Sequence, residues 1–208
     1  MSQAAIKSYF DYKSPYAYLA KDLTHELERE TGARVDWLPY TLDIPAYLGS
    51  ARVDATGKVV EENRNAHQWR RVKYSYMDCR RDANRRGLTI RAPRKIFDSS
   101  LANIGMLYAK RHGVFRDYHD RVFERFWQRE LDIENPAALA AVLQECGAPT
   151  AEFLGFLHGQ GRRELTEIRS EAEAAGVFGV PSFLFADGDL YWGREHLQRV
   201  RERLLTGQ

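Results

Sequence analysis

The chain has 208 residues, 44% of them apolar and 29% charged, and it carries a formal net charge of +2. These values are ordinary for a globular protein with a substantial core, and the length fits one domain or one domain with a large insertion. The sequence has no low-complexity tract, no basic leader before an apolar core and no bilayer-length apolar run, so we expect a cytoplasmic protein without a membrane partner.

The first stretch of the chain predicts a strand that runs into a helix. Residues 6–12 are mostly apolar, and Ser14 and Pro15 then provide a favourable N-cap and a favourable first helical residue. The unpaired N–H groups of a helix start and the positive end of the helix dipole would lie above Ser14. This turn is therefore a candidate anion site, unless Ser14 only caps the helix.

The predicted helix has one apolar face and ends at Gly32. The residues on this face are spaced by three and four, namely Tyr16, Leu19, Ala20, Leu23 and Leu27. A second strand is predicted at about 34–42, where Val35 and Trp37 alternate with polar neighbours. Strand, helix and strand make a β-α-β unit, which implies parallel pairing and a right-handed crossover.

The pattern changes after residue 42. Residues 43–57 predict an irregular stretch, and a long helix is predicted from about 62 to 86, closed by Gly87. The further predicted helices cover residues 99–112, 115–130, 136–145, 151–158 and 163–175. So many helices after one β-α-β unit indicate a helical insertion rather than a continued α/β winding.

Strand character returns at the end of the chain. A short strand is predicted at 182–186 and a partner strand at 190–192. Asp187 and Gly188 between them are a strong hairpin signal. A last helix is predicted at about 194–205.

In chain order these elements predict an α/β protein, a thioredoxin-like fold with a large inserted all-helical domain. We expect residues 1–43 and 177–208 to form a discontinuous thioredoxin-like domain. Residues 44–176 would form the helical insertion domain.

The two cysteines, Cys79 and Cys146, are far apart in the sequence. Neither belongs to a CxxC motif or to a metal-ligand spacing. Cys79 lies on the apolar stripe of the long helix, together with Tyr76 and Ala83. We therefore interpret both cysteines as small core residues and expect no redox pair and no metal site.

Positive charge is concentrated between residues 61 and 95, where eleven Lys or Arg and four Asp or Glu give +7 and leave −5 for the remainder. A basic helix can contact phosphates. The chain has no nucleic-acid recognition motif, however, so we expect no nucleic-acid partner. We interpret most of these cations as a solvated helix face, some of which attract anionic ligands.

The segment FDYKSPYAYLA at residues 10–20 resembles the start of the 2-hydroxychromene-2-carboxylate isomerases and of the related kappa-class glutathione transferases. Both belong to the DsbA-like branch of the thioredoxin superfamily. The DsbA oxidoreductases carry Cys-Pro-His-Cys at this turn, where this chain has Ser14-Pro15-Tyr16-Ala17. Thiol–disulfide exchange through this turn is excluded because neither position supplies a thiolate.

A second segment, GVFGVPSF at residues 176–183, resembles the family's GVFGVP segment, whose proline follows a cis peptide bond. The resemblance implies that the backbone of Val180, next to Pro181, faces the first helix turn. It also implies that this backbone pairs with the cysteinyl unit of glutathione as an added strand would. The other interpretation is a Val-Pro entry to a strand.

The cofactor that the resemblance implies is glutathione, bound as a catalyst and not as a redox partner. A thiol directed at the Ser14 hydroxyl and at a helix N-terminus has its ionised form favoured by hydrogen bonding and by the dipole, so its pKa falls. Ser14 is therefore the candidate catalytic residue.

Three further positions correspond to residues that hold glutathione in the family. Asn63, followed by a basic residue, resembles the family's glutathione-contacting Asn. Arg71 stands where the family usually has a Lys that meets the glycine carboxylate, which Arg can bind bidentately. Glu195 stands where the family has an Asp that meets the γ-glutamyl ammonium, although a helix-start acid has a structural role as well.

An aromatic substrate would need aromatic walls. We expect the pocket to draw on some of Tyr12, Tyr16, Phe97 and Trp127, although each such residue is more often part of a core.

The resemblance implies a glutathione-dependent isomerase that acts on a conjugated unsaturated carboxylic acid by reversible thiolate addition, and it favours an aromatic acid. Two alternatives stay open: a kappa-type transferase that conjugates electrophiles, and a redox-inactive DsbA-like binding module. The expected partners are glutathione and a small-molecule substrate. A homodimer is expected from the resemblance and from the frequency of homodimers.

Overall fold

The computed structural model describes residues 6–206 and contains a four-stranded sheet with the order β2-β1-β5-β6. The strands are β1 (Ile6–Phe10), β2 (Val35–Pro39), β5 (Ser182–Phe185) and β6 (Leu190–Trp192). β1 pairs with β2 in parallel and with β5 antiparallel, and β5 pairs with β6 antiparallel. The sheet therefore joins the two ends of the chain, as the thioredoxin-like prediction requires.

Helix α1 (Pro15–Thr31) connects β1 and β2, so the predicted β-α-β unit is confirmed. It ends at Gly32, whose left-handed φ of 67° lets its N–H donate to the Glu28 carbonyl. Two residues of the predicted buried face differ: Leu23 is exposed and Tyr16 is only partly buried, and both line a cavity.

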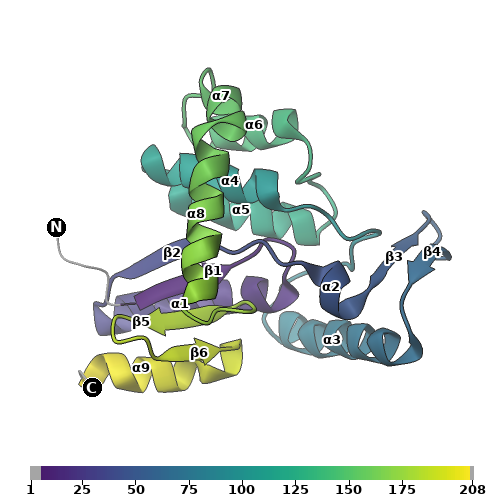
Figure 1. Cartoon of the computed structure of the whole chain (residues 1–208), viewed down its shortest axis with the longest axis horizontal. Coiled ribbons are helices and arrows are strands. Elements are labelled where there is room, and N and C mark those ends of the chain that lie inside the picture. Colours follow the sequence, from purple (N-terminus) through teal and green to yellow (C-terminus); the bar gives the residue numbers. More distant parts are fainter. Residues whose placement is uncertain (1–5, 207–208) are drawn as a thin grey trace.

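The predicted block of helices is confirmed, with shifts of a few residues at their ends. It consists of α4 (Ser100–Arg111), α5 (Phe115–Trp127), α6 (Pro136–Glu145), α7 (Phe153–His158) and α8 (Gln160–Ala174). Figure 1 shows these helices gathered on one side of the sheet, with α8 running back along the sheet toward β5. The two-domain division at residues 43 and 177 stays a prediction.

Residues 43–65 differ from the prediction. A short helix, α2 (Ile44–Leu48), precedes a hairpin of β3 (Ser50–Val53) and β4 (Val59–Asn63), where only an irregular stretch and a helix start were expected. Every residue of β4 is exposed, so the hairpin carries no apolar alternation from which it could be recognised. The insertion is therefore not all-helical.

The long helix α3 (Ala66–Arg85) begins later than predicted because Asn65 and Gln68 form a capping box. Asn65 Oδ1 accepts from the Gln68 N–H, and Gln68 Oε1 accepts from the Asn65 N–H, both at 2.9 Å. Figure 1 shows α3 and the hairpin projecting together from one end of the sheet.

The last described elements are a 3-10 turn (Arg194–His196) and α9 (Leu197–Thr206), which packs against α1. Aromatic side chains pack between the sheet and α5. The ring centres of Phe10 and His119 are 4.4 Å apart, and those of Tyr12 and Phe123 are 4.8 Å apart. Among residues 6–206, no helix has the length and apolar character to cross a bilayer.

Candidate active site

Ser14 lies at the turn between β1 and α1, with only 4% of its surface exposed. Its N–H donates to the Asp11 carbonyl at 3.0 Å, and its Oγ accepts from the Ala17 N–H at 3.2 Å. Pro15 occupies the first helical position. The predicted N-cap is confirmed, and because Oγ acts as an acceptor there, its own hydrogen stays available for donation.

Fewer N–H groups are free at this helix start than the sequence suggested. Pro15 has none, the Ala17 N–H binds Ser14 Oγ, and the Tyr18 N–H binds the Ser14 carbonyl at 3.1 Å. Within the described part of the chain, only the Tyr16 N–H of this first turn has no partner. Two donors therefore remain for an anion, this N–H and the Ser14 hydroxyl.

Val180 is joined to Pro181 by a cis peptide bond, as the resemblance implied. Val180 is 6% exposed, and neither its N–H nor its carbonyl has a hydrogen-bond partner among residues 6–206. The neighbouring groups are satisfied, since the Pro181 carbonyl accepts from the Gly193 N–H at 2.9 Å. Buried backbone groups are nearly always paired, so the unpaired edge of Val180 fits an extended peptide ligand.

Both the Ser14 turn and Val180 border a cavity of about 1490 Å³. Its walls come from the start of α1, from α2 and α3, from residues 92–97, and from the two segments 178–181 and 192–195. Seven predicted site residues line it, namely Ser14, Tyr16, Arg71, Phe97, Val180, Pro181 and Glu195.

Three predicted site residues do not line this cavity. Tyr12 and Trp127 have no exposed surface and belong to the core, where the Tyr12 hydroxyl lies 3.2 Å from Nδ1 of His119. Neither residue is therefore placed to contact a molecule in this cavity. Asn63 is an exposed residue of β4, paired with Ser50, and it is not among the residues that line the cavity.

Arg64, the residue after Asn63, lines the cavity instead. Its Nε donates to the Leu48 carbonyl at 3.0 Å, and its guanidinium lies 5.0 Å from the centre of the Trp69 ring. These contacts fix the hairpin and α2 to the start of α3. Of the Asn63-Arg64 pair that the sequence pattern singled out, Arg64 is therefore the residue that borders the cavity.

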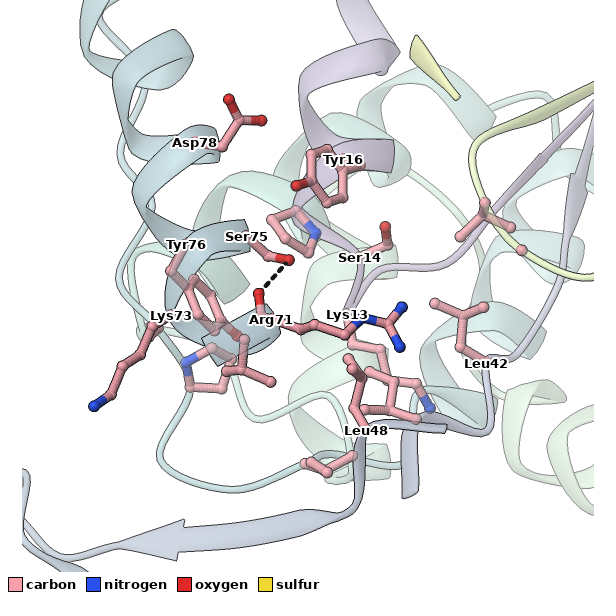
Figure 2. Close-up of a pocket in the computed structure, with 18 of the residues that line it drawn as sticks. Lys13, Ser14, Tyr16, Leu42, Leu48, Arg71, Lys73, Ser75, Tyr76 and Asp78 are labelled. Carbon is pink, nitrogen blue, oxygen red and sulfur yellow. Dashed lines mark hydrogen bonds between the residues drawn. The ribbon is translucent and has the colours of Figure 1, made fainter. Parts of the chain in front are cut away.

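Arg71 and Glu195 offer opposite charges on different walls. Figure 2 shows the Arg71 side chain reaching from α3 toward the first turn of α1, below Ser14. The Arg71 guanidinium and the Glu195 carboxylate have no hydrogen-bond or ion-pair partner in the described residues. Glu195 lies in the 3-10 turn before α9 rather than in the predicted first turn of that helix. Both charges are free for a ligand.

Two functional candidates escaped the sequence analysis. Arg194 forms ion pairs with Asp78, at 3.1 Å, and with Asp82, and so ties the C-terminal segment to α3. The sequence did carry a signal for these ion pairs, because Asp78 and Asp82 are two acids spaced by four residues on an otherwise basic helix. Lys13 is a buried cation that lines the cavity beside Ser14, and a single Lys in a loop gives no pattern to recognise.

The two cysteine thiols of the chain do not serve this cavity. Cys79 is fully buried, and burial raises the pKa of its thiol to about 12. Cys146 is partly buried, and burial raises its pKa as well. Neither cysteine lines the cavity, and no disulfide joins them. No group of three or more His, Cys, Asp or Glu within residues 6–206 is placed to hold a metal ion.

A family model described as the DSBA-like thioredoxin domain matches residues 5–205. The chain is 29% identical to a 2-hydroxychromene-2-carboxylate isomerase of Sphingobium xenophagum, over 96% of this chain and 97% of that protein. It is 28% identical to an isomerase of the same name from Pseudomonas putida, over 91% and 88%. A solved 2-hydroxychromene-2-carboxylate isomerase structure superposes with a TM-score of 0.72 at 23% identity, over 96% and 93% of the two chains.

Proposed function

We propose that this chain, which belongs to the DSBA-like thioredoxin family, is a glutathione-dependent isomerase of a conjugated unsaturated carboxylic acid with an aromatic ring. The two curated relatives named 2-hydroxychromene-2-carboxylate isomerase support the reaction class. The observation that carries the proposal is the unpaired backbone of Val180 among the described residues, since Val180 shares with Ser14 a cavity that neither cysteine of the chain lines.

The residues around the cavity fit glutathione group by group. The N–H and carbonyl of Val180 suit a peptide backbone, the free guanidinium of Arg71 suits a carboxylate, and Glu195 suits an ammonium. When bound, glutathione supplies a thiolate that adds reversibly to a conjugated carbon of the substrate, so that the double bond can rotate and re-form.

Ser14 and the start of α1 favour the ionised sulfur. The Ser14 hydroxyl and the Tyr16 N–H are free donors, and the 17-residue α1 places its positive dipole end beside them. A hydrogen bond to a charged group contributes about 1.5–3 kcal/mol, and about 1.4 kcal/mol shifts a pKa by one unit. One such donor therefore brings a thiol pKa from about 8.5 to near neutrality.

The cavity has room and aromatic surface for a second molecule. Its volume of about 1490 Å³ exceeds the roughly 300–1,000 Å³ of a typical single-ligand pocket. The exposed rings of Phe178 and Trp192 lie 4.9 Å apart on its wall, and Tyr16 and Phe97 also line it. Flat apolar rings of this kind suit an aromatic substrate.

The test uses excess 2-hydroxychromene-2-carboxylate with a small amount of glutathione. We expect each glutathione molecule to support many turnovers and to be recovered unchanged, because the reaction returns the thiol. Consumption of one glutathione per product would instead identify a kappa-type transferase. A folded protein that does not bind millimolar glutathione would indicate the binding module.

A further inference from the structure

Lys13 is a buried ammonium without a hydrogen-bond acceptor. The residue is 7% exposed, and its Nζ lies 3.8 Å from Oδ2 of the fully buried Asp11. That distance is about 1 Å longer than a charge-assisted hydrogen bond. None of the three ammonium hydrogens has an acceptor in the described part of the chain.

The oxygens of Asp11 are already used by the backbone. Oδ2 accepts from the Leu42 N–H at 2.7 Å, and Oδ1 accepts from the Lys13 N–H at 3.4 Å. The other acid whose charge reaches Lys13 is Asp98, and its carboxylate accepts from the Ser100 N–H at 2.9 Å. Asp11 is therefore an acid close to the Lys13 ammonium that leaves the ammonium donors free.

A buried ammonium with three free donors needs an oxygen acceptor, and Lys13 lines the same cavity as Ser14. We propose that Lys13 binds the anionic oxygen of the substrate, a carboxylate or the oxygen conjugated to its double bond. This inference rests on the proposed isomerase function and extends it by naming the substrate group and the residue that holds it.

The position of Lys13 suits the charge movement in the substrate. As the double bond opens, its electron pair moves onto the conjugated oxygen, where the ammonium offsets the new charge. The pair returns when the bond re-forms, so the step needs no oxidant and no net proton transfer. Arg71 reaches the cavity from α3 and, as an exposed side chain, is assigned to glutathione.

The test compares Lys13→Met with Lys73→Met, which removes another cavity-wall cation that Figure 2 shows pointing away from Ser14. The probes are 2-naphthoate, a flat acid with no alkene to isomerise, and the uncharged 2-naphthamide. Calorimetry with saturating glutathione should show Lys13→Met weakening 2-naphthoate binding by about 10- to 100-fold while 2-naphthamide binding stays within about twofold. Lys73→Met should change neither.

Lys13→Met leaves Asp11 buried and unpaired, so the double variant Asp11→Asn/Lys13→Met removes both charges and should show the same selective loss. Lys13→Arg should keep most of the affinity. Equal 2-naphthoate binding by the wild type and both Lys13→Met proteins would overturn the inference. The 2-naphthoate titrations are repeated without glutathione, so that the role of Lys13 is tested even if glutathione does not bind. A wild type that fails to bind glutathione would refute the proposed function separately.

Discussion

The first turn of α1 shows how few groups a helix start leaves free. Proline removes one donor, the N-cap hydroxyl takes a second, and the helix takes a third, so only the Tyr16 N–H and the Ser14 hydroxyl hydrogen remain. The cap and the proposed function therefore use different parts of one hydroxyl, the lone pair for Ala17 and the hydrogen for an anion. Capping and anion binding are compatible here.

His119 gives a prediction for the pH dependence of stability. It is fully buried, its Nε2 has no hydrogen-bond partner among residues 6–206, and burial, with the nearby His25, lowers its pKa well below 6.5. In the unfolded chain His119 takes up a proton near pH 6.5, whereas in the folded protein it stays neutral. The free energy of unfolding should therefore fall as the pH drops below about 6.5, by at most about 1.4 kcal/mol per pH unit.

Urea unfolding at several pH values between 7 and 5 measures this slope. His119→Gln should be less stable overall but should lose this part of the slope, because it removes the titrating group. His158→Gln changes an exposed histidine and serves as the control. An unchanged slope in His119→Gln would show that another group controls the acid sensitivity.

At the scale of elements, the apolar patterns located the helices that pack against a core. The apolar patterns predicted α4, α5 and α6 within a few residues, since α5 and α6 each bury one face and α4 is buried on all sides from Ala102 to Ala109. The hairpin of β3 and β4 escaped because its residues are exposed or only partly buried, so no alternation records its strands. A backbone contact rather than apolar burial fixes its place beside α2.

That contact is made at Gly49, which has a φ of 62° and packs against the Asn63 carbonyl. A Cβ at this position would overlap that oxygen, so Gly49→Ala should cost about 2–4 kcal/mol of unfolding free energy. Gly87 has a φ of 68° with open space around it, so Gly87→Ala should cost only about 1 kcal/mol. Urea unfolding measures the loss of unfolding free energy in both variants. Equal losses would show that the contact between Gly49 and the Asn63 carbonyl does not contribute to stability.

At the scale of the whole molecule, sheet pairing brings together the two motifs at opposite ends of the chain. β1 leads into Ser14 and β5 follows Pro181, and the antiparallel pairing of Tyr9 with Ser182 places their ends beside the cavity. The resemblance of the two motifs could predict that Ser14 and Pro181 lie close together, because the pairing of β1 with β5 is part of the thioredoxin-like fold.

The remaining parts of the site depend on which way single side chains point. Tyr12 and Trp127 lie in the core, although their sequence neighbours Lys13 and Phe126 line the cavity. Composition does not distinguish these outcomes, because aromatic rings suit a core and a pocket equally well. Lys13 could not be predicted either, since its burial depends on Asp11 and on the chain around Leu42. The expected homodimer stays a prediction.

The role of Ser14 in favouring the glutathione thiolate is tested most directly by titrating glutathione into the wild type, Ser14→Ala and Ser14→Thr. Calorimetry measures binding, and ultraviolet absorbance measures the bound thiolate. We predict that Ser14→Ala still binds glutathione, because Val180, Arg71 and Glu195 are unchanged, but that its thiolate absorbance weakens while Ser14→Thr keeps it. A thiolate signal in Ser14→Ala equal to that of the wild type would contradict the role of Ser14.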